Sequence, residues 1–136
     1  MSQAQTHFHA VVWIDHTHAR VAFFDADDAT LTTLRSHGEP HVHHQAGVLG
    51  AGHATSDPRF LADVTAAIAP AGEVLVCGPG LAKAELLRHL EAHAPAVRRK
   101  VVAGEPSDHP SDGELVDHAR RFFKVADRTT PQRPHR

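Results

Sequence analysis

The sequence contains little cysteine, no long apolar run and no marked excess of either charge. Its one cysteine, Cys77, excludes an internal disulfide and fits a reducing compartment, so we expect a cytoplasmic protein. No apolar stretch approaches the length of a membrane span, and residues 1–10 lack the basic start and apolar run of a signal peptide. We therefore expect no membrane partner. The 136 residues are enough for one domain that buries a core without disulfides or metal.

The charge is unevenly distributed along the chain. The net charge is −2 with neutral histidines, which gives no general argument for nucleic acid. Residues 1–97 contain five Lys/Arg and ten Asp/Glu, a net −5, whereas residues 98–136 contain nine and six, a net +3. This pattern is typical of a solvated helix face and tail, and it is also the composition of a surface that holds RNA phosphates. The basic residues considered for such a surface are Arg98, Arg99, Lys100, Arg120, Arg121 and Lys124.

Apolar patterns and breaker residues predict five strands and three helices. The strands are expected at residues 8–15, 19–24, 30–35, 73–77 and 97–103. The first helix begins at the cap Asp57-Pro58, the second follows Gly80 and ends at Pro95, and the third opens with the capping box Ser111–Glu114. Trp13 and Cys77 are interpreted as buried residues of their strands.

The order strand-strand-strand-helix-strand-helix-strand-helix predicts an α/β fold. An antiparallel hairpin sheet followed by alternating strands and helices is the order of the ribonuclease H-like fold. We expect a mixed five-stranded sheet with three helices packed on it, and parallel later strands joined by right-handed crossovers. This is an analogy of fold, and it does not determine the chemistry.

One segment, residues 36–54, departs from this regular pattern. It contains five histidines and four glycines and has no helical periodicity. Imidazole is a common metal ligand, and glycine lets the backbone approach a ligand closely. We call residues 36–54 the His/Gly segment and expect it to be a functional loop.

Five segments of the chain resemble known translation proteins. Residues 74–90 run from an apolar strand through Gly78-Pro79-Gly80 and Lys83 into a helix, which resembles the central domain of Pelota and of the archaeal and eukaryotic class I release factors. The hairpin at 11–24 matches the opening strands of the same domain. The segments 41–44, 50–53 and 108–112 are similar to those of small bacterial proteins called translational machinery proteins.

The resemblance implies a cytoplasmic protein that contacts the ribosome or structured RNA in translation. Residues 7–126 would form one release-factor-like domain, preceded by a flexible N-terminus at 1–6 and followed by a polar, basic tail at 127–136. Release factors carry a Gly-Gly-Gln motif after the third strand, where this chain has the His/Gly segment and contains no Gly-Gly-Gln. Peptide-release activity is therefore not implied.

RNA contact is the function that we favour for the basic and histidine-rich residues. Lys83, one turn into the second helix, would assist an RNA phosphate, although Gly78-Pro79-Gly80 has the composition of an ordinary strand-to-helix turn. Within the His/Gly segment the predicted RNA-contacting residues are His41, His43, His44 and His53.

Metal binding is the alternative for the same four histidines. His41 and His43 lie two positions apart, so an extended segment points both to one side. Two to four of these imidazoles could supply tetrahedral ligands for zinc or another divalent metal, but the spaced Cys/His signature of structural zinc is missing. His89 and His93 also have chelating spacing on a helix, and we interpret them as solvent-facing residues because nothing nearby in the sequence completes a site.

Two further functions stay open. A metal-dependent RNA hydrolase of ribonuclease H-like fold would need converging carboxylates, for which Asp15 and Asp112 are candidates. The set is incomplete, and Asp15 also fits a turn residue that caps the hairpin. The third possibility is a homo-oligomer that pairs through a sheet edge.

Overall fold

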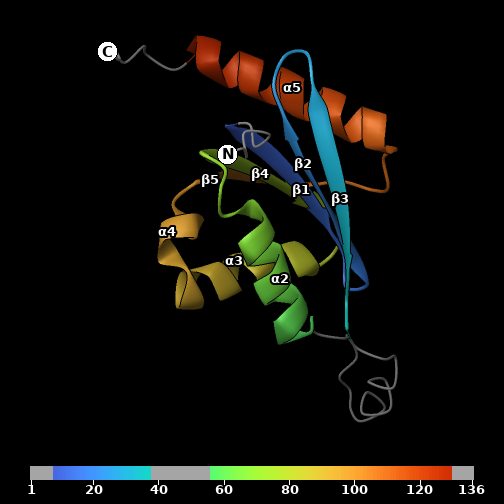
Figure 1. Cartoon of the computed structure of the whole chain (residues 1–136), viewed down its shortest axis with the longest axis vertical. Helices are drawn as coiled ribbons and strands as arrows, with labels where there is room; N and C mark the ends of the chain where they lie inside the picture. The colour runs from blue at the N-terminus through green and yellow to red at the C-terminus, as the bar shows by residue number, and fades with distance from the viewer. Residues whose placement is uncertain (1–7, 38–55, 130–136) are drawn as a thin grey trace, which may run out of the picture.

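The structure is a computed structural model that describes residues 8–37 and 56–129. Five strands form one mixed sheet in the order β3-β2-β1-β4-β5, and helices lie on both of its faces (Figure 1). The strands are β1 (His9–Ile14), β2 (His18–Phe24), β3 (Ala29–Arg35), β4 (Glu73–Gly78) and β5 (Val101–Pro106). The helices are α2 (Pro58–Ile68), α3 (Ala82–His93), α4 (Pro95–Arg98) and α5 (Asp112–Thr129).

The pairing of the strands confirms the predicted mixed sheet. β1 pairs antiparallel with β2, and β2 pairs antiparallel with β3, as consecutive hairpins do. β1 pairs parallel with β4, and β4 with β5, and these connections run through α2 and α3. Because β3 is antiparallel to β2, it runs in the same direction as β1, β4 and β5. The carboxyl ends of these four strands therefore lie at one edge of the sheet.

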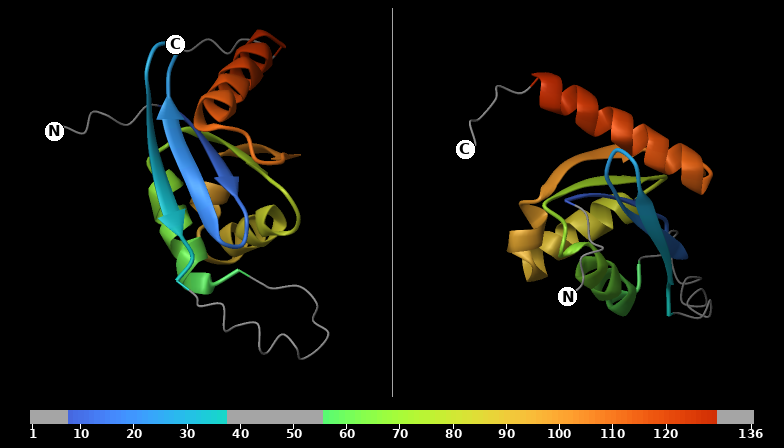
Figure 2. Two further views of the ribbon diagram at one scale, coloured as in Figure 1. Left: turned by 90° about the vertical axis from the view of Figure 1, so that its right-hand side faces the viewer. Right: turned by 45° about the horizontal axis from the view of Figure 1, so that its top comes forward.

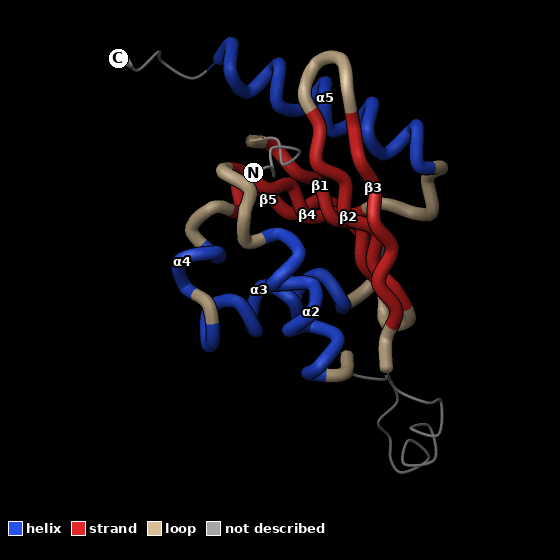
Figure 3. The backbone as a smooth tube through the Cα atoms, in the orientation of Figure 1, coloured by secondary structure: helices blue, strands red, loops and turns tan. Residues whose placement is uncertain are grey.

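Two hydrophobic cores lie on opposite faces of the sheet. Ala10, Val12 and Ile14 of β1 face the core that α2 and α3 cover. Val11 and Trp13, which alternate with them, face the core that α5 covers. Figures 2 and 3 show the same layers, with α5 on one side of the sheet and α2 and α3 on the other. β1 is buried on both faces, which explains its continuous apolar sequence.

The helix starts that were predicted from capping residues are confirmed. The Asp57 carboxylate accepts the backbone N–H of Arg59 over 3.0 Å, and Pro58 occupies the first helical position of α2. The capping box is reciprocal: Ser111 donates its backbone N–H to Glu114 Oε1 over 2.8 Å, and Glu114 donates its own to Ser111 Oγ over 3.1 Å. Each cap satisfies N–H groups that the helix itself leaves without a partner.

The number of helices differs from the prediction. The described residues contain four helices rather than three, because Pro95 opens the short helix α4 and does not merely end α3. The strand expected at 97–103 is accordingly displaced to Val101–Pro106. α4 places the apolar side chain of Val97 in the core that α2 and α3 cover. This packing outweighs the preference of valine for a strand.

The ends of the domain are described only in part. α5 continues to Thr129, so residues 127–129 of the expected tail belong to this helix. Residues 1–7, 38–55 and 130–136 lie outside the described residues, and so do the expected flexible N-terminus and the rest of the tail. Within residues 8–37 and 56–129, no helix is both long enough and apolar enough to cross a membrane.

Candidate functional site

The carboxyl ends of the parallel strands form the candidate site. Asp15 follows β1, Gly78 ends β4, and Ser107 follows β5 and donates its backbone N–H to the Gly78 carbonyl over 3.2 Å. The β1–β2 turn, residues 15–17, lies at the same edge. Arg35, at the end of β3, pairs there with His18, at the start of β2. We call this region the carboxyl edge. Ligands of open α/β sheets commonly bind at such an edge.

Ser36, the first residue of the His/Gly segment, and Ser56, two positions after its end, are both held at the carboxyl edge. Ser36 donates its backbone N–H to the Thr17 carbonyl over 2.9 Å. Ser56, which is 8% exposed, donates its backbone N–H to Glu85 Oε1 over 2.8 Å. Ser36 and Ser56, which lie on either side of positions 38–55, are therefore both at this edge. The four histidines predicted to contact RNA or metal, His41, His43, His44 and His53, lie outside the described residues.

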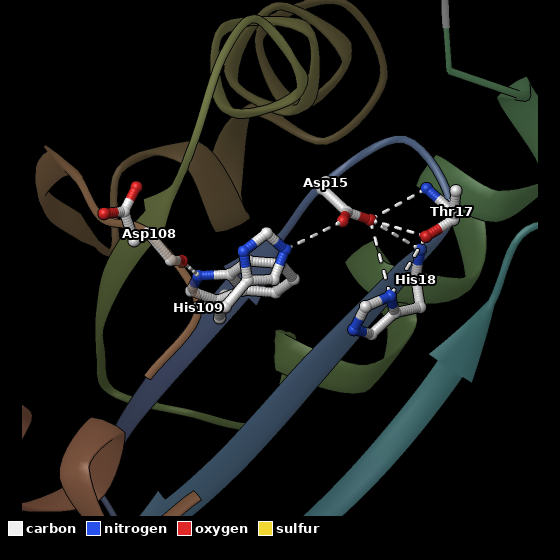
Figure 4. Close-up of polar contacts among 6 residues, drawn as sticks. Asp15, Thr17, His18, Asp108 and His109 are labelled. Carbon is white, nitrogen blue, oxygen red and sulfur yellow. Dashed lines mark hydrogen bonds and ion pairs between the residues drawn. The ribbon is translucent and has the colours of Figure 1, made fainter. Parts of the chain in front are cut away.

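Asp15 organises the β1–β2 turn. Its Oδ1 atom accepts hydrogen bonds from Thr17 N (2.8 Å), Thr17 Oγ1 (2.9 Å) and His18 N (2.9 Å), as Figure 4 shows. Burial raises the pKa of the Asp15 carboxyl, but the hydrogen bonds from His18 and Thr17 and the charge of His18 outweigh burial, so the pKa is lowered overall. Asp15 is thus an ionised turn cap, as the sequence indicated.

Two histidines flank the same carboxylate. His18 Nδ1 lies 3.4 Å from Asp15 Oδ1, and His109 Nε2 lies 3.7 Å from Asp15 Oδ2 (Figure 4). His109 comes from the segment between β5 and α5, so the fold brings together residues that are far apart in the chain. His109 is 66% exposed, and its imidazole is accessible to a ligand at this edge.

Trp13 supports these histidines from inside the domain. Its ring centroid lies 5.1 Å from that of His18 and 4.8 Å from that of His109, and the Arg20 guanidinium lies 4.8 Å from it. Trp13 Nε1 donates a hydrogen bond of 2.7 Å to the Asp108 carbonyl. The ring is fully buried, which confirms its predicted core role, and the Asp108 bond fixes the position of the β5–α5 connection.

The described residues do not assemble the carboxylate set of a metal-dependent hydrolase. Asp15 Oδ1 is used in the turn, and Asp112 Oδ1 accepts a hydrogen bond of 2.9 Å from Arg20. Within residues 8–37 and 56–129, no three His, Cys, Asp or Glu side chains converge in a way that could hold a metal ion. Cys77 is buried, and burial followed by the charge of Glu105 raises the pKa of its thiol to about 12, against a smaller lowering by Lys83.

The basic residues expected to contact RNA do not lie together. Lys83 is in the first turn of α3, at the carboxyl edge. Arg98, Arg99 and Lys100 precede β5 and so lie at its amino end, on the opposite edge. Arg120 also lies at this opposite edge. It donates to the carbonyls of the β2–β3 turn, and this turn follows Phe24, which pairs with His9 at the start of β1.

Three of these basic side chains have structural partners. Arg98 Nε donates to Glu91 Oε2 over 3.2 Å, and Lys100 Nζ donates to the Ala69 carbonyl over 2.7 Å. Arg120 donates to the Asp25 carbonyl over 2.8 Å and to the Asp28 carbonyl over 3.2 Å. Arg99, Arg121 and Lys124 are exposed. The Arg121 guanidinium lies 4.0 Å from the Asp117 carboxylate, which makes a long and weak surface ion pair. These three are the better-placed residues for a polyanion at the amino-end edge.

Sequence reasoning missed Glu85 and Arg20. Glu85 belongs to α3 but contacts Ser56 and lies 3.3 Å from His16 Nε2 at the β1–β2 turn. Arg20 connects Trp13 to Asp112. Neither residue belongs to a motif. Their partners Ser56, His16 and Asp112 are 29 or more positions away along the chain, and only Trp13, the partner of Arg20 on the neighbouring strand, is closer. No local pattern points to them.

No protein-family model and no curated protein matches the sequence. Solved structures do match. Pelota of Archaeoglobus fulgidus has a TM-score of 0.61 at 15% identity, over 88% of this chain and 32% of Pelota. The archaeal translation termination factor aRF1 has a TM-score of 0.57 at 12% identity, over 88% of this chain and 39% of that factor. Dom34 of S. cerevisiae, described as a translation termination-like factor involved in RNA quality control, has a TM-score of 0.58 at 12% identity, over 88% and 35% of the two chains.

The chain therefore spans between about a third and two-fifths of the length of these proteins. Likeness at such identities concerns the fold and not the activity. The five-stranded mixed sheet, with α2 and α3 on one face and α5 on the other, is the fold of a part of Pelota, Dom34 and aRF1.

Proposed function

We propose that this chain is a cytoplasmic, translation-associated accessory protein that contacts the ribosome, tRNA or rRNA through its carboxyl edge, without peptide-release activity. The observation that carries the proposal is the attachment to this edge of Ser36, the first residue of the His/Gly segment, and of Ser56, which follows the segment. The relatives in fold support it, because they include a translation termination factor and a termination-like factor of RNA quality control.

The chemistry of the carboxyl edge suits contact with RNA. The exposed imidazole of His109 and the ammonium of Lys83 can donate hydrogen bonds to phosphate or 2′-hydroxyl oxygens. The His/Gly segment would add His41, His43, His44 and His53, and its glycines would let the backbone approach RNA closely. The segment has no Gly-Gly-Gln sequence, so the proposal does not include hydrolysis of peptidyl-tRNA.

A second contact at the opposite edge belongs to the same proposal. Arg99, Arg121 and Lys124 are exposed there and would hold phosphate. Arg98, Lys100 and Arg120 would contribute less, because each already donates to a carboxylate or carbonyl of the domain.

Co-sedimentation with ribosomes at increasing salt tests the proposal. We expect the wild-type chain to co-sediment at low salt and to dissociate as salt rises, because phosphate contacts release counterions. Replacement of His41, His43, His44 and His53 by glutamine should weaken the association. Lys83→Ala should lower the slope of log affinity against log salt by about one if its ammonium contacts a phosphate.

A matched variant controls for the loss of histidines in general. Replacing His89 and His93 by glutamine removes two histidines of the later part of α3, away from the carboxyl edge, and should leave co-sedimentation unchanged. Absent or salt-independent association of the wild-type chain would overturn the proposal. So would an equal loss in the two histidine variants when circular dichroism shows both to be folded.

A further inference from the structure

His89 and His93 form a pair of adjacent imidazoles on α3, away from the carboxyl edge. They lie four positions apart, and their ring centroids are 4.7 Å apart with an interplanar angle of 44°. Residues at this spacing occupy the same face of a helix, one turn apart. The backbone of α3 therefore holds both rings on one side without help from a loop.

The position of the pair in α3 favours a cation. His93 is the last residue of α3, whose final turn is closed by a hydrogen bond of 2.8 Å from Ala94 N to the Leu90 carbonyl. The carboxyl end of a helix carries partial negative charge, which stabilises a cation beside the last turn. Because the helix backbone holds both histidines in place, they form a better chelating pair than two histidines on a mobile chain.

We propose that His89 and His93 bind a divalent transition-metal ion of the imidazole-preferring class, Cu²⁺, Ni²⁺ or Zn²⁺, as a two-ligand site on α3. Within the described residues no third His, Cys, Asp or Glu completes a cluster, so water supplies the remaining ligands. Among these ions Cu²⁺ forms the tightest complexes with nitrogen ligands. This site is separate from the proposed RNA contact and from the histidines of the His/Gly segment.

Calorimetric titration with CuCl₂ at neutral pH tests the site in the full-length chain. The parent for the titration carries glutamine at positions 41, 43, 44 and 53, so that histidines of the His/Gly segment do not contribute. We expect His89→Gln and His93→Gln each to remove the same equivalent of bound Cu²⁺. His118→Gln, which removes a histidine of α5, should retain it.

A spacing variant separates chelation by a pair from the mere number of histidines. The double substitution His93→Ala with Ala84→His keeps two histidines on α3 but places them five positions apart, on different faces of the helix. Position 84 is exposed, so the variant is expected to fold. It should lose the equivalent of Cu²⁺ as the single variants do. The same stoichiometry in the parent, in both single variants and in the spacing variant would overturn the proposal.

Discussion

The Glu85 carboxylate accepts the backbone N–H of Ser56 over 2.8 Å, although the two residues are 29 positions apart. Ser56 is buried, so its N–H has limited access to water. The same carboxylate lies 3.3 Å from His16 Nε2 in the β1–β2 turn. One side chain of α3 thus connects Ser56, which follows the His/Gly segment, to the turn that Asp15 caps.

Glu85→Ala should lower the free energy of unfolding by about 1–3 kcal/mol, because it leaves the buried N–H of Ser56 without its acceptor. Glu85→Gln keeps an acceptor oxygen and should cost less. Urea denaturation at neutral pH measures both. Glu91→Ala is the control, since Glu91 pairs with Arg98 on the surface and its loss should cost about 1 kcal/mol or less. Equal losses for Glu85→Ala and Glu91→Ala would contradict the assigned role.

Asp15→Asn should reduce the sensitivity of the domain to acid. The pKa of Asp15 is lowered in the folded state relative to the unfolded chain. Its stabilising contribution is therefore complete above the unfolded pKa of about 3.9 and is lost as the pH falls through the folded pKa. The variant should be less stable than wild type at neutral pH, and the difference should shrink as the pH falls below the unfolded pKa of about 3.9.

Denaturation at a series of pH values measures this difference. Asp27→Asn serves as the control, because Asp27 is an exposed residue of the β2–β3 turn. A destabilisation by Asp15→Asn that is the same at neutral and acid pH would show that the charge of Asp15 does not matter.

Gly78→Ala should be strongly destabilising. Gly78 has φ +147°, and a Cβ atom there would lie 2.2 Å from the Ile14 carbonyl oxygen, a backbone atom of β1 that cannot move aside. We expect a loss of more than about 2 kcal/mol in the free energy of unfolding, from backbone strain and the clash together. Thermal or urea denaturation measures it.

Gly113→Ala is the matched comparison, because no atom lies within 4 Å of a Cβ at that position of α5. It should stabilise the domain by about 0.5–1 kcal/mol, as alanine does in place of glycine in a helix. The prediction for Gly78 fails if the two glycine variants differ little in stability.

Cys77 should be unreactive in the folded protein. Its thiol is buried and its pKa is raised to about 12, so very little thiolate is present near neutral pH. A thiol reagent added in excess should label the chain slowly under native conditions and rapidly in denaturant. Rapid stoichiometric labelling of the folded chain would show that β4 opens or that the thiolate is stabilised.

Local features of the sequence predicted most of the secondary structure correctly. The caps at Asp57 and Ser111 depend on atoms two or three residues apart, so their sequence patterns are sufficient to locate the starts of α2 and α5. The error at α4 arose because no local feature of the sequence distinguishes a strand from a short helix there. Val97 fits either a strand or a buried helix position, and only the packing against α2 and α3 distinguishes the two.

The candidate site was predictable only in its outline. The position of the His/Gly segment after the third strand followed from the order of elements. The order of elements did not predict that residues 98–100 and Arg120 lie at the opposite edge from Lys83. That separation depends on the direction of each strand in the assembled sheet. The pairing of His18 and His109 with one carboxylate also requires β5 and β1 to end at the same edge.

The sequence by itself determined the alternation of strands and helices and the capped helix starts, because these rest on periodicity and on contacts within one turn. The tertiary structure alone decided that Glu85 reaches Ser56, that Arg20 pairs with Asp112 rather than leaving it free for metal, and that residues 98–100 lie at the opposite edge from His18 and His109. These contacts join residues far apart in the chain, so sheet order and strand direction determine them, and neither is written in any short stretch of residues.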